Sequence, residues 1–329
     1  MIQSWMHNKR FPCGMTAIAL VLGGCTADPT STAGDSAASN GAGNAPLQVV
    51  TTILPITQFT QAVVGDRAEV RQLLPNNVGP HDYQAKPADV QAIAAADLLV
   101  KNGLGLETFL AGLIENADNT TLVTVDSSAQ IATLINEDAD HNSHDGSAEP
   151  HKNHEHGDAD PHVWLDPKRA VIQVETIRDA LVEADPAGEA IYIDNAAAYI
   201  AQLQALDRDI TEQLAPYTGQ TYISFHDVTA YFADSYGLTA EFLVDIPEEN
   251  PSPEDVRHII ETVEAKSIDV LLSEPQAGED AFAALAKDLD VEVSLFDPME
   301  TGDALNPDQY LAIMRRNATQ LERALDNDN

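Results

Sequence analysis

A histidine-rich acidic stretch is the part of this chain whose residue types most clearly suggest chemistry. It spans residues 138–158, carries Gly, Ser and Asn between its histidines, and ends shortly before the segment Asp160-Pro161-His162-Val163-Trp164. Its histidines are His141, His144, His151, His154 and His156. Imidazole is the commonest protein ligand for metals such as zinc, and a stretch of this composition has too few apolar side chains to form a core. We therefore expect a flexible loop that holds labile metal ions; a solvated acidic loop without a role is the alternative.

Three further histidines stand where expected strands meet loops. They are His81, His162 and His226, and Asp297 follows another expected strand in the same way as His226. In open parallel α/β sheets, ligands bind beyond the carboxyl ends of the strands. Three imidazoles and one carboxylate that converge there would form a tetrahedral site that suits zinc, whereas manganese is expected to take more oxygen ligands. Each histidine alone also has a simpler interpretation, such as a hydrogen bond within a turn for His81 or a helix cap for His226.

Short apolar runs that alternate with helical patterns predict the elements that position these side chains. The apolar runs are residues 49–53, 70–74, 98–100, 122–125, 222–225, 242–244, 270–273 and 291–296. The helical patterns are residues 58–64, 87–96, 107–115, 228–236, 253–265, 281–288 and 307–325. Continuous apolar runs between helices are typical of parallel sheets covered on both faces, so we expect two α/β lobes.

The sequence pattern of residues 187–214 differs from that of the alternating segments and predicts one long helix. Tyr199, Leu203, Leu206, Ile210 and Leu214 recur at helical spacing and form one apolar stripe. A single helix of this length that joins the two lobes would limit hinge motion between them. A packing helix that belongs to the second lobe alone is the alternative.

The N-terminus predicts export. Lys9 and Arg10 precede a short apolar run, and Leu22-Gly23-Gly24-Cys25 follows it in the manner of a bacterial lipoprotein signal. We expect a signal peptide over residues 1–24, a lipid-bearing Cys25, and a flexible linker rich in Ala, Gly, Ser and Thr over residues 25–46. The expected domains that follow are an N-terminal lobe over 47–186, a connecting helix over 187–215 and a C-terminal lobe over 216–329.

The net charge of the chain limits the classes of partner that it is expected to bind. The chain carries a formal charge of -36 at pH 7, so it is not expected to bind nucleic acid or anionic lipid headgroups. A strongly acidic surface raises the local concentration of cations, and it equally suits a saline medium, where salt screens the repulsion between like charges. The even spread of acidic residues along the chain favours the saline interpretation for most of the charge.

The motifs together resemble one known family, the ZnuA/TroA-like (cluster A-I) zinc-binding solute-binding proteins of bacterial metal ABC importers. The resemblance covers nearly all of the chain from about residue 47. The matching segments are Gly79-Pro80-His81-Asp82-Tyr83, Asn102-Gly103-Leu104-Gly105-Leu106-Glu107, Asp160-Pro161-His162-Val163-Trp164-Leu165-Asp166-Pro167, Ser224-Phe225-His226-Asp227, Ser273-Glu274-Pro275-Gln276 and Asp297-Pro298. A histidine-rich acidic loop directly before the His162 segment is itself typical of zinc-type members.

The resemblance implies a site and a fold. The metal ligands would be His81, His162 and His226, with Asp297 or a water molecule in the fourth position. Zinc-type members have histidine at the place of His226, where manganese-type members often have glutamate, so Zn²⁺ is the expected cargo and Mn²⁺ is less favoured. The implied fold is α/β, with two Rossmann-like lobes joined by a long rigid helix and the metal in the cleft between them.

The implied function is that of a receptor and not of an enzyme. A member of this family would be exported, lie in the periplasm or on the outer face of the cytoplasmic membrane, and deliver Zn²⁺ to the permease of an ABC transporter. We further expect a monomer anchored by lipid at Cys25. Two alternatives are a zinc-dependent hydrolase, which the lack of a His-Glu-x-x-His motif disfavours, and a metal-binding surface adhesin.

Overall fold

The part of the chain that can be described begins after the expected signal peptide. The computed structural model describes residues 46–76, 78–80, 83–134, 159–244, 251–266, 268, 270–275, 280–299 and 301–326. The expected ligand His81, the histidines of residues 138–158 and the expected lipidation residue Cys25 lie outside the described residues. Within the described ranges, no helix is both long and apolar enough to cross a membrane.

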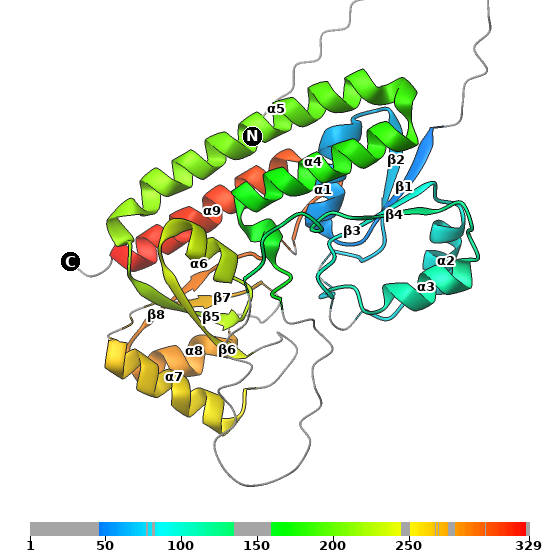
Figure 1. Ribbon diagram of the computed structural model, residues 1–329. Helices are drawn as coiled ribbons and strands as arrows, with labels where there is room; N and C mark the ends of the chain where they lie inside the picture. The colour runs from blue at the N-terminus through cyan, green and yellow to red at the C-terminus, as the bar shows by residue number, and fades with distance from the viewer. Residues whose placement is uncertain are drawn as a thin grey trace, which may run out of the picture. The chain divides into compact units, whose positions relative to one another are not determined.

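The N-terminal lobe is built on a four-stranded parallel sheet of order β2-β1-β3-β4 (Figure 1). Its strands are β1 (Leu47–Thr51), β2 (Ala68–Gln72), β3 (Leu98–Lys101) and β4 (Val123–Asp126). Its helices are α1 (Leu54–Val64), α2 (Pro87–Ala94) and α3 (Leu110–Ala117). The chain leaves β1 toward β2 on one side and returns to β3 on the other, so the switch point of the sheet lies between β1 and β3.

The C-terminal lobe repeats this arrangement in a second parallel sheet of order β6-β5-β7-β8. Its strands are β5 (Thr221–His226), β6 (Thr239–Val244), β7 (Val270–Ser273) and β8 (Glu292–Leu295). Its helices are α6 (Ala230–Tyr236), α7 (Pro253–Lys266), α8 (Asp280–Leu289) and α9 (Asp308–Leu325). The switch point of this sheet lies between β5 and β7, the strands that end at His226 and just before Glu274.

Helices α4 (Pro167–Ala184) and α5 (Glu189–Leu214) lie between the two sheets in the sequence. The expected stripe of α5 is buried, and α5 packs on α1 and α4 as well as on α9, so it contacts helices of both lobes (Figure 1). This confirms the predicted α/β fold with a long connecting helix. Short 3₁₀ turns among the described residues are η2 (Val163–Leu165), η3 (Pro186–Gly188) and η4 (Ala215–Tyr217).

Helix α4 is an element that the sequence analysis does not predict. It begins at Pro167 behind the N-cap Asp166, whose side chain accepts a hydrogen bond from the Lys168 amide, and it buries one face along its length. Because α4 follows the His162 segment directly, its start fixes where that segment ends.

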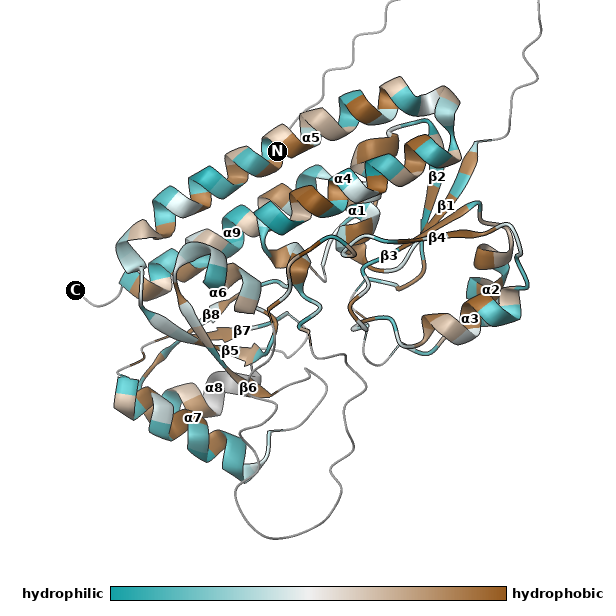
Figure 2. Cartoon of the chain, in the orientation of Figure 1, coloured by the Kyte–Doolittle hydropathy of each residue, from teal (hydrophilic) through white to brown (hydrophobic). Residues whose placement is uncertain are grey.

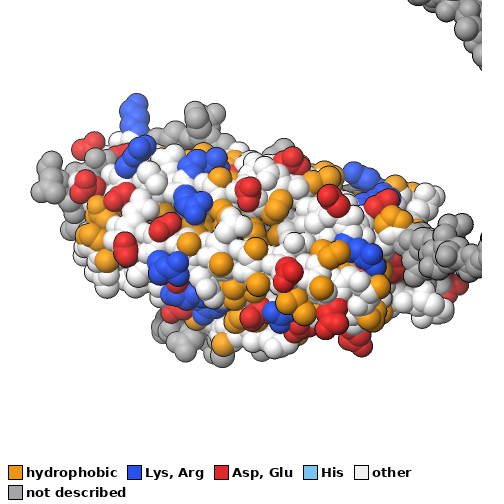
Figure 3. All heavy atoms as spheres, turned by 90° about the horizontal axis from the view of Figure 1, so that it is seen from above, with side chains coloured by type: hydrophobic (Ala, Val, Ile, Leu, Met, Phe, Trp, Pro, Cys, Tyr) orange, Lys and Arg blue, Asp and Glu red, His pale blue; other side chains and the backbone are white. Residues whose placement is uncertain are grey.

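The central strands contribute fully buried side chains to the core, together with the helices that pack on them. Leu98, Leu99 and Val100 of β3 are fully buried, as is Leu271 of β7, because helices cover both faces of each sheet. In Figure 2 the strands are mostly hydrophobic, whereas hydrophilic and hydrophobic residues alternate along the outer helices. On the face seen in Figure 3, acidic, basic and apolar side chains are interspersed.

Candidate metal centre

His162 is held by the aspartate two residues before it. The backbone amide and the ring Nδ1 of His162 both lie 2.8 Å from Oδ1 of Asp160, so one carboxylate oxygen fixes the backbone turn and the orientation of the ring. The imidazole is only 5% exposed, and its ring meets the indole of Trp164 edge to face at 5.2 Å between centroids. The Asp160-Pro161-His162 segment is therefore a rigid local unit.

His226 is held in the same way by a residue distant in sequence. It is the last residue of β5, and its backbone amide and ring Nδ1 lie 3.2 Å and 2.6 Å from Oε1 of Glu274. Glu274 follows β7, which is the neighbour of β5 in the sheet. Both side chains are 2% exposed. The pair thus occupies the switch point of the C-terminal sheet, where parallel α/β sheets bind their ligands.

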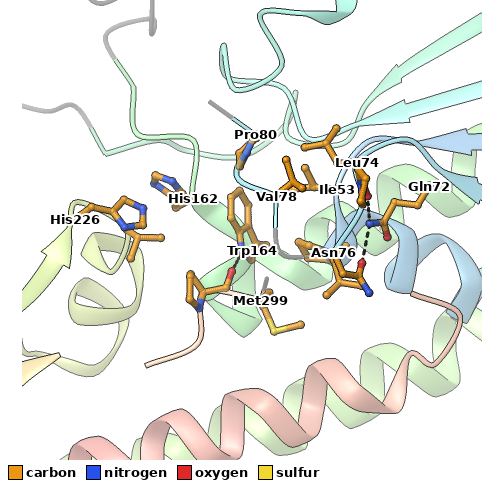
Figure 4. A pocket seen from close by; sticks show the side chains of 15 residues that line it. Ile53, Gln72, Leu74, Asn76, Val78, Pro80, His162, Trp164, His226 and Met299 are labelled. Atoms are coloured by element: carbon orange, nitrogen blue, oxygen red, sulfur yellow. Dashed lines mark hydrogen bonds between the residues drawn. The ribbon is translucent and has the colours of Figure 1, made fainter. Parts of the chain in front are cut away.

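The two imidazoles lie next to each other. Their ring centroids are 5.5 Å apart, with the ring planes at 74°. Figure 4 shows His162, from the segment before η2, and His226, from the end of β5, side by side at one end of a pocket. In each ring Nδ1 contacts a carboxylate, so Nε2 is the nitrogen through which either histidine would bind a metal ion. A carboxylate behind a histidine is the common arrangement for histidines that bind zinc.

The pocket beside the two histidines is otherwise mostly apolar. Its walls include residues from both lobes, among them Ile53, Leu74, Val78, Pro80, Trp164 and Met299. Figure 4 shows the labelled apolar side chains on the side of the pocket away from His226, with Trp164 beside His162. Apolar walls exclude water and strengthen electrostatic interactions within the pocket, so a cation there would depend strongly on the two histidines.

Buried negative charge lies behind the imidazoles. Burial disfavours the charged form of His162, but the nearby carboxylates of Asp160, Asp227 and Glu274 together outweigh this effect, so the pKa of His162 is raised above its ordinary value. Among the described residues, Oδ2 of Asp160 and Oε2 of Glu274 are buried without a hydrogen-bond partner. Two carboxylates that are only partly satisfied would be stabilised by a positive charge in front of the histidines.

Asp297 lies close to the pocket in the chain, but its carboxylate is already engaged. It is 1% exposed, and its oxygens accept hydrogen bonds from the amide of Met299 at 3.0 Å, from the hydroxyl of Thr301 and from the guanidinium of Arg316 at 3.1 Å. The next two residues, Pro298 and Met299, line the pocket. In the described ranges, no three His, Cys, Asp or Glu side chains gather in a group that could hold a metal. The fourth ligand therefore stays a prediction, as does His81.

Comparison with known proteins decides the family. The model of the family "Zinc-uptake complex component A periplasmic", ZnuA, matches residues 49–324. The chain belongs to the ZnuA family. The zinc-binding lipoprotein AdcA of Streptococcus pneumoniae is 30% identical over 286 residues, which cover 86% of this chain and 56% of AdcA. The chain thus spans about half the length of this relative.

Two further comparisons show the range within the family. The manganese-binding lipoprotein MntA of Halalkalibacterium halodurans is 30% identical over 88% of each chain. The crystal structure of the Zn(II)-bound ZnuA-like domain of S. pneumoniae AdcA matches with a TM-score of 0.70 at 28% identity, over 86% of this chain and 100% of that domain. The ZnuA family consists of solute-binding receptors, which confirms that the chain is not an enzyme. These relatives include zinc-binding and manganese-binding proteins, so they do not decide which metal this chain binds.

The carboxylates that hold the two imidazoles are the functional residues whose roles the sequence analysis misses. Asp160 and Glu274 both stand in segments that it identifies, but only their contacts with His162 and His226 reveal what they do. For Asp160 a signal exists in the sequence, since an Asp two residues before a His favours a turn closed by its side chain. For Glu274 the signal is its place after the strand expected at residues 270–273.

Proposed function

We propose that this chain is an extracytoplasmic receptor that binds Zn²⁺ through His81, His162 and His226 and delivers it to the permease of an ABC transporter. The observation that supports this most is the pair of buried imidazoles 5.5 Å apart, each with Nδ1 on a buried carboxylate. Two such rings supply half of a tetrahedral zinc shell with their tautomers already fixed.

His81 is proposed as the third ligand because the residue before it in the chain lines the pocket. Pro80 lines the same pocket as His162 and His226, and His81 directly follows Pro80 in the sequence. Consecutive Cα atoms are about 3.8 Å apart, so the loop that carries His81 has the reach to complete a three-histidine site. Asp297 or a water molecule would take the fourth position.

The donor set favours zinc over manganese. Three imidazole nitrogens match the coordination that Zn²⁺ prefers, whereas Mn²⁺ takes more oxygen ligands. The carboxylates Asp160 and Glu274 face the Nδ1 atoms, so they act on the histidines instead of adding oxygen ligands. We propose the residues 138–158 as a labile secondary site that gathers zinc ions without fixed geometry.

The cellular setting follows from the N-terminal sequence. We propose cleavage before Cys25, lipid attachment at that cysteine, and a monomer on the outer face of the cytoplasmic membrane. Labelling with a radioactive fatty acid, compared between the intact chain and a Cys25→Ser variant, tests the anchor: label retained by the variant contradicts it.

Competition with a chromophoric zinc chelator tests the site. His81→Ala, His162→Ala and His226→Ala should each weaken zinc binding by orders of magnitude, because each removes one ligand from a site that needs all three. His258→Ala is the matched control, since His258 is an exposed histidine on α7. If one of the three variants binds zinc as tightly as the unaltered chain, the histidine that it lacks is not a ligand. The same titration with Mn²⁺ should show weaker binding than with Zn²⁺, and the reverse order would contradict the proposed cargo.

A further inference from the structure

Tyr231 makes an unusual pair of contacts beside the candidate metal centre. It is the second residue of α6 and is fully buried, with its ring packed against Ile131 and Val163. Its hydroxyl donates a hydrogen bond to the carbonyl oxygen of Asp160 at 2.8 Å and accepts one from the amide of Leu134 at 3.1 Å. One side chain of the C-terminal lobe thus holds two backbone segments that precede α4.

The ring of Tyr231 is also held by a cation. The guanidinium of Arg169 lies 4.5 Å from the ring centroid, in the geometry of a cation–π contact. Arg169 is itself held by Asp166 at 2.7 Å and by Asp234 of α6 at 3.3 Å. The hydroxyl is therefore presented by a ring with little freedom to move.

The contact with Asp160 connects the two candidate ligands. His226 ends β5, and the chain then enters α6, which carries Tyr231 five residues later. Asp160 is the residue whose carboxylate orients His162, so its carbonyl and its side chain are held at the same time. From the N-terminal lobe, Asn102 donates to the carbonyl oxygen of Pro161 at 2.9 Å. The His162 segment is thus fixed from both lobes.

The Tyr231 hydroxyl can donate its hydrogen bond over the whole physiological range of pH. Burial, together with the nearby charge of Asp160, raises the pKa of Tyr231 to about 12. The group therefore keeps its proton and remains a donor to the Asp160 carbonyl oxygen. A phenylalanine at this position would preserve the packing of the ring and lose only the two hydrogen bonds.

We propose that the Tyr231 hydroxyl is a positioning group that sets the spacing between His162 and His226 for the metal ion. The inference rests on the proposed function. Without the hydroxyl, the Asp160-Pro161-His162 segment gains freedom relative to β5, and metal binding must then order it again at an entropic cost. If this ordering cost equals the contribution of one hydrogen bond, zinc affinity falls about tenfold.

The test compares Tyr231→Phe with Tyr199→Phe in the full chain. Tyr199 is a buried tyrosine of α5 whose hydroxyl donates to the carbonyl oxygen of Pro307 at 2.9 Å. The control therefore loses one buried hydrogen bond to a backbone carbonyl, whereas Tyr231→Phe loses such a bond and also the one accepted from the Leu134 amide. Zinc affinity is measured by chelator competition, and Co²⁺ serves as a probe because its visible absorption reports the coordination geometry. Thermal unfolding of the metal-free variants measures the structural cost of each change.

Tyr231→Phe should bind Zn²⁺ about tenfold more weakly and shift the visible bands of bound Co²⁺, while Tyr199→Phe changes neither. An unaltered affinity and Co²⁺ spectrum in Tyr231→Phe overturns the proposal, and so does an equal loss in both variants. Failure of the proposed function looks different, because the unaltered chain would then bind neither Zn²⁺ nor Co²⁺ tightly.

Discussion

Replacing Glu274 by glutamine should separate metal affinity from fold stability. The carboxylate of Glu274 lies 2.6 Å from Nδ1 of His226, and both side chains are almost completely buried. Glutamine keeps the shape and an accepting oxygen but removes the charge that strengthens the ligand nitrogen. Loss of such a partner typically weakens metal binding by about 10-fold to 100-fold, which is about 1.4 to 2.7 kcal/mol.

The stability of the metal-free protein should not fall together with the zinc affinity. Oε2 of Glu274 is buried and has no hydrogen-bond partner among the described residues, so the charge is costly in the absence of a metal. Glu274→Gln removes that cost, and we expect the midpoint of metal-free unfolding to stay the same or to rise. The opposite pattern is expected for Asp185→Asn, which breaks the ion pair with Arg67 at 2.8 Å outside the pocket. That variant should lose stability and keep its zinc affinity.

The assay is chelator competition for zinc, run beside thermal unfolding of both metal-free variants. Glu274 positions His226 if Glu274→Gln binds zinc more weakly while its midpoint of thermal unfolding does not fall. If Glu274→Gln binds zinc as tightly as the unaltered chain, the reasoning from the carboxylate–imidazole pair is refuted.

The remaining predictions concern pH, the histidine-rich residues, Asp297 and a helix cap. Because the carboxylates around His162 together outweigh burial and raise its pKa, protons should compete with zinc from above pH 6.5. The loss of zinc affinity should be about 1.4 kcal/mol per pH unit per histidine, and a flat affinity between pH 8 and 5 would contradict a histidine site. The same shift stabilises the metal-free fold below about pH 6.5, and this contribution is lost as the pH rises through the raised pKa. Deletion of residues 138–158 should preserve the tight site and reduce the number of weak zinc ions in titration calorimetry, and loss of the tight site would assign an essential ligand to them. Asp297→Ala should weaken zinc binding less than any of the three histidine substitutions, as chelator competition would show, because water can replace the carboxylate. Asp166→Ala should lower the free energy of unfolding in urea by about 1 to 2 kcal/mol through loss of the N-cap of α4 together with the ion pair to Arg169, and an unaltered midpoint would speak against both contributions.

The fold was accessible from the sequence because its central strands are buried on both faces. Strands such as β3 and β7 therefore appear as continuous apolar runs, and their lengths separate them from the helices between them. The boundaries differ by a few residues, since hydrogen bonding of the ladder and burial of side chains do not stop at the same residue. His226, for example, was expected just after its strand and is the last residue of β5.

Helix α4 shows where a pattern was present but weak. Its buried positions Ala170, Val174, Ile177 and Leu181 have helical spacing, but charged residues surround them and Ala170 contributes little apolar surface. Helices of this kind take most of their stability from tertiary packing, here against α1 and α5.

The environment of the site depended on contacts that local sequence does not contain. The pairing of His226 with Glu274 requires β5 and β7 to be neighbours, which is a property of the strand order. Likewise, the bond between Asp297 and Arg316 depends on how α9 packs beside β8. Positions of chemistry at strand ends could be predicted, but the partners of each side chain could not.

Diffraction from crystals of the zinc-loaded protein, recorded at the zinc absorption edge, tests the central claim most directly. A three-histidine zinc site should give one strong anomalous peak about 2.0 to 2.1 Å from imidazole nitrogens of His81, His162 and His226, with Nε2 as the ligand atom in the latter two. A strong peak elsewhere, with none between His162 and His226, would contradict it.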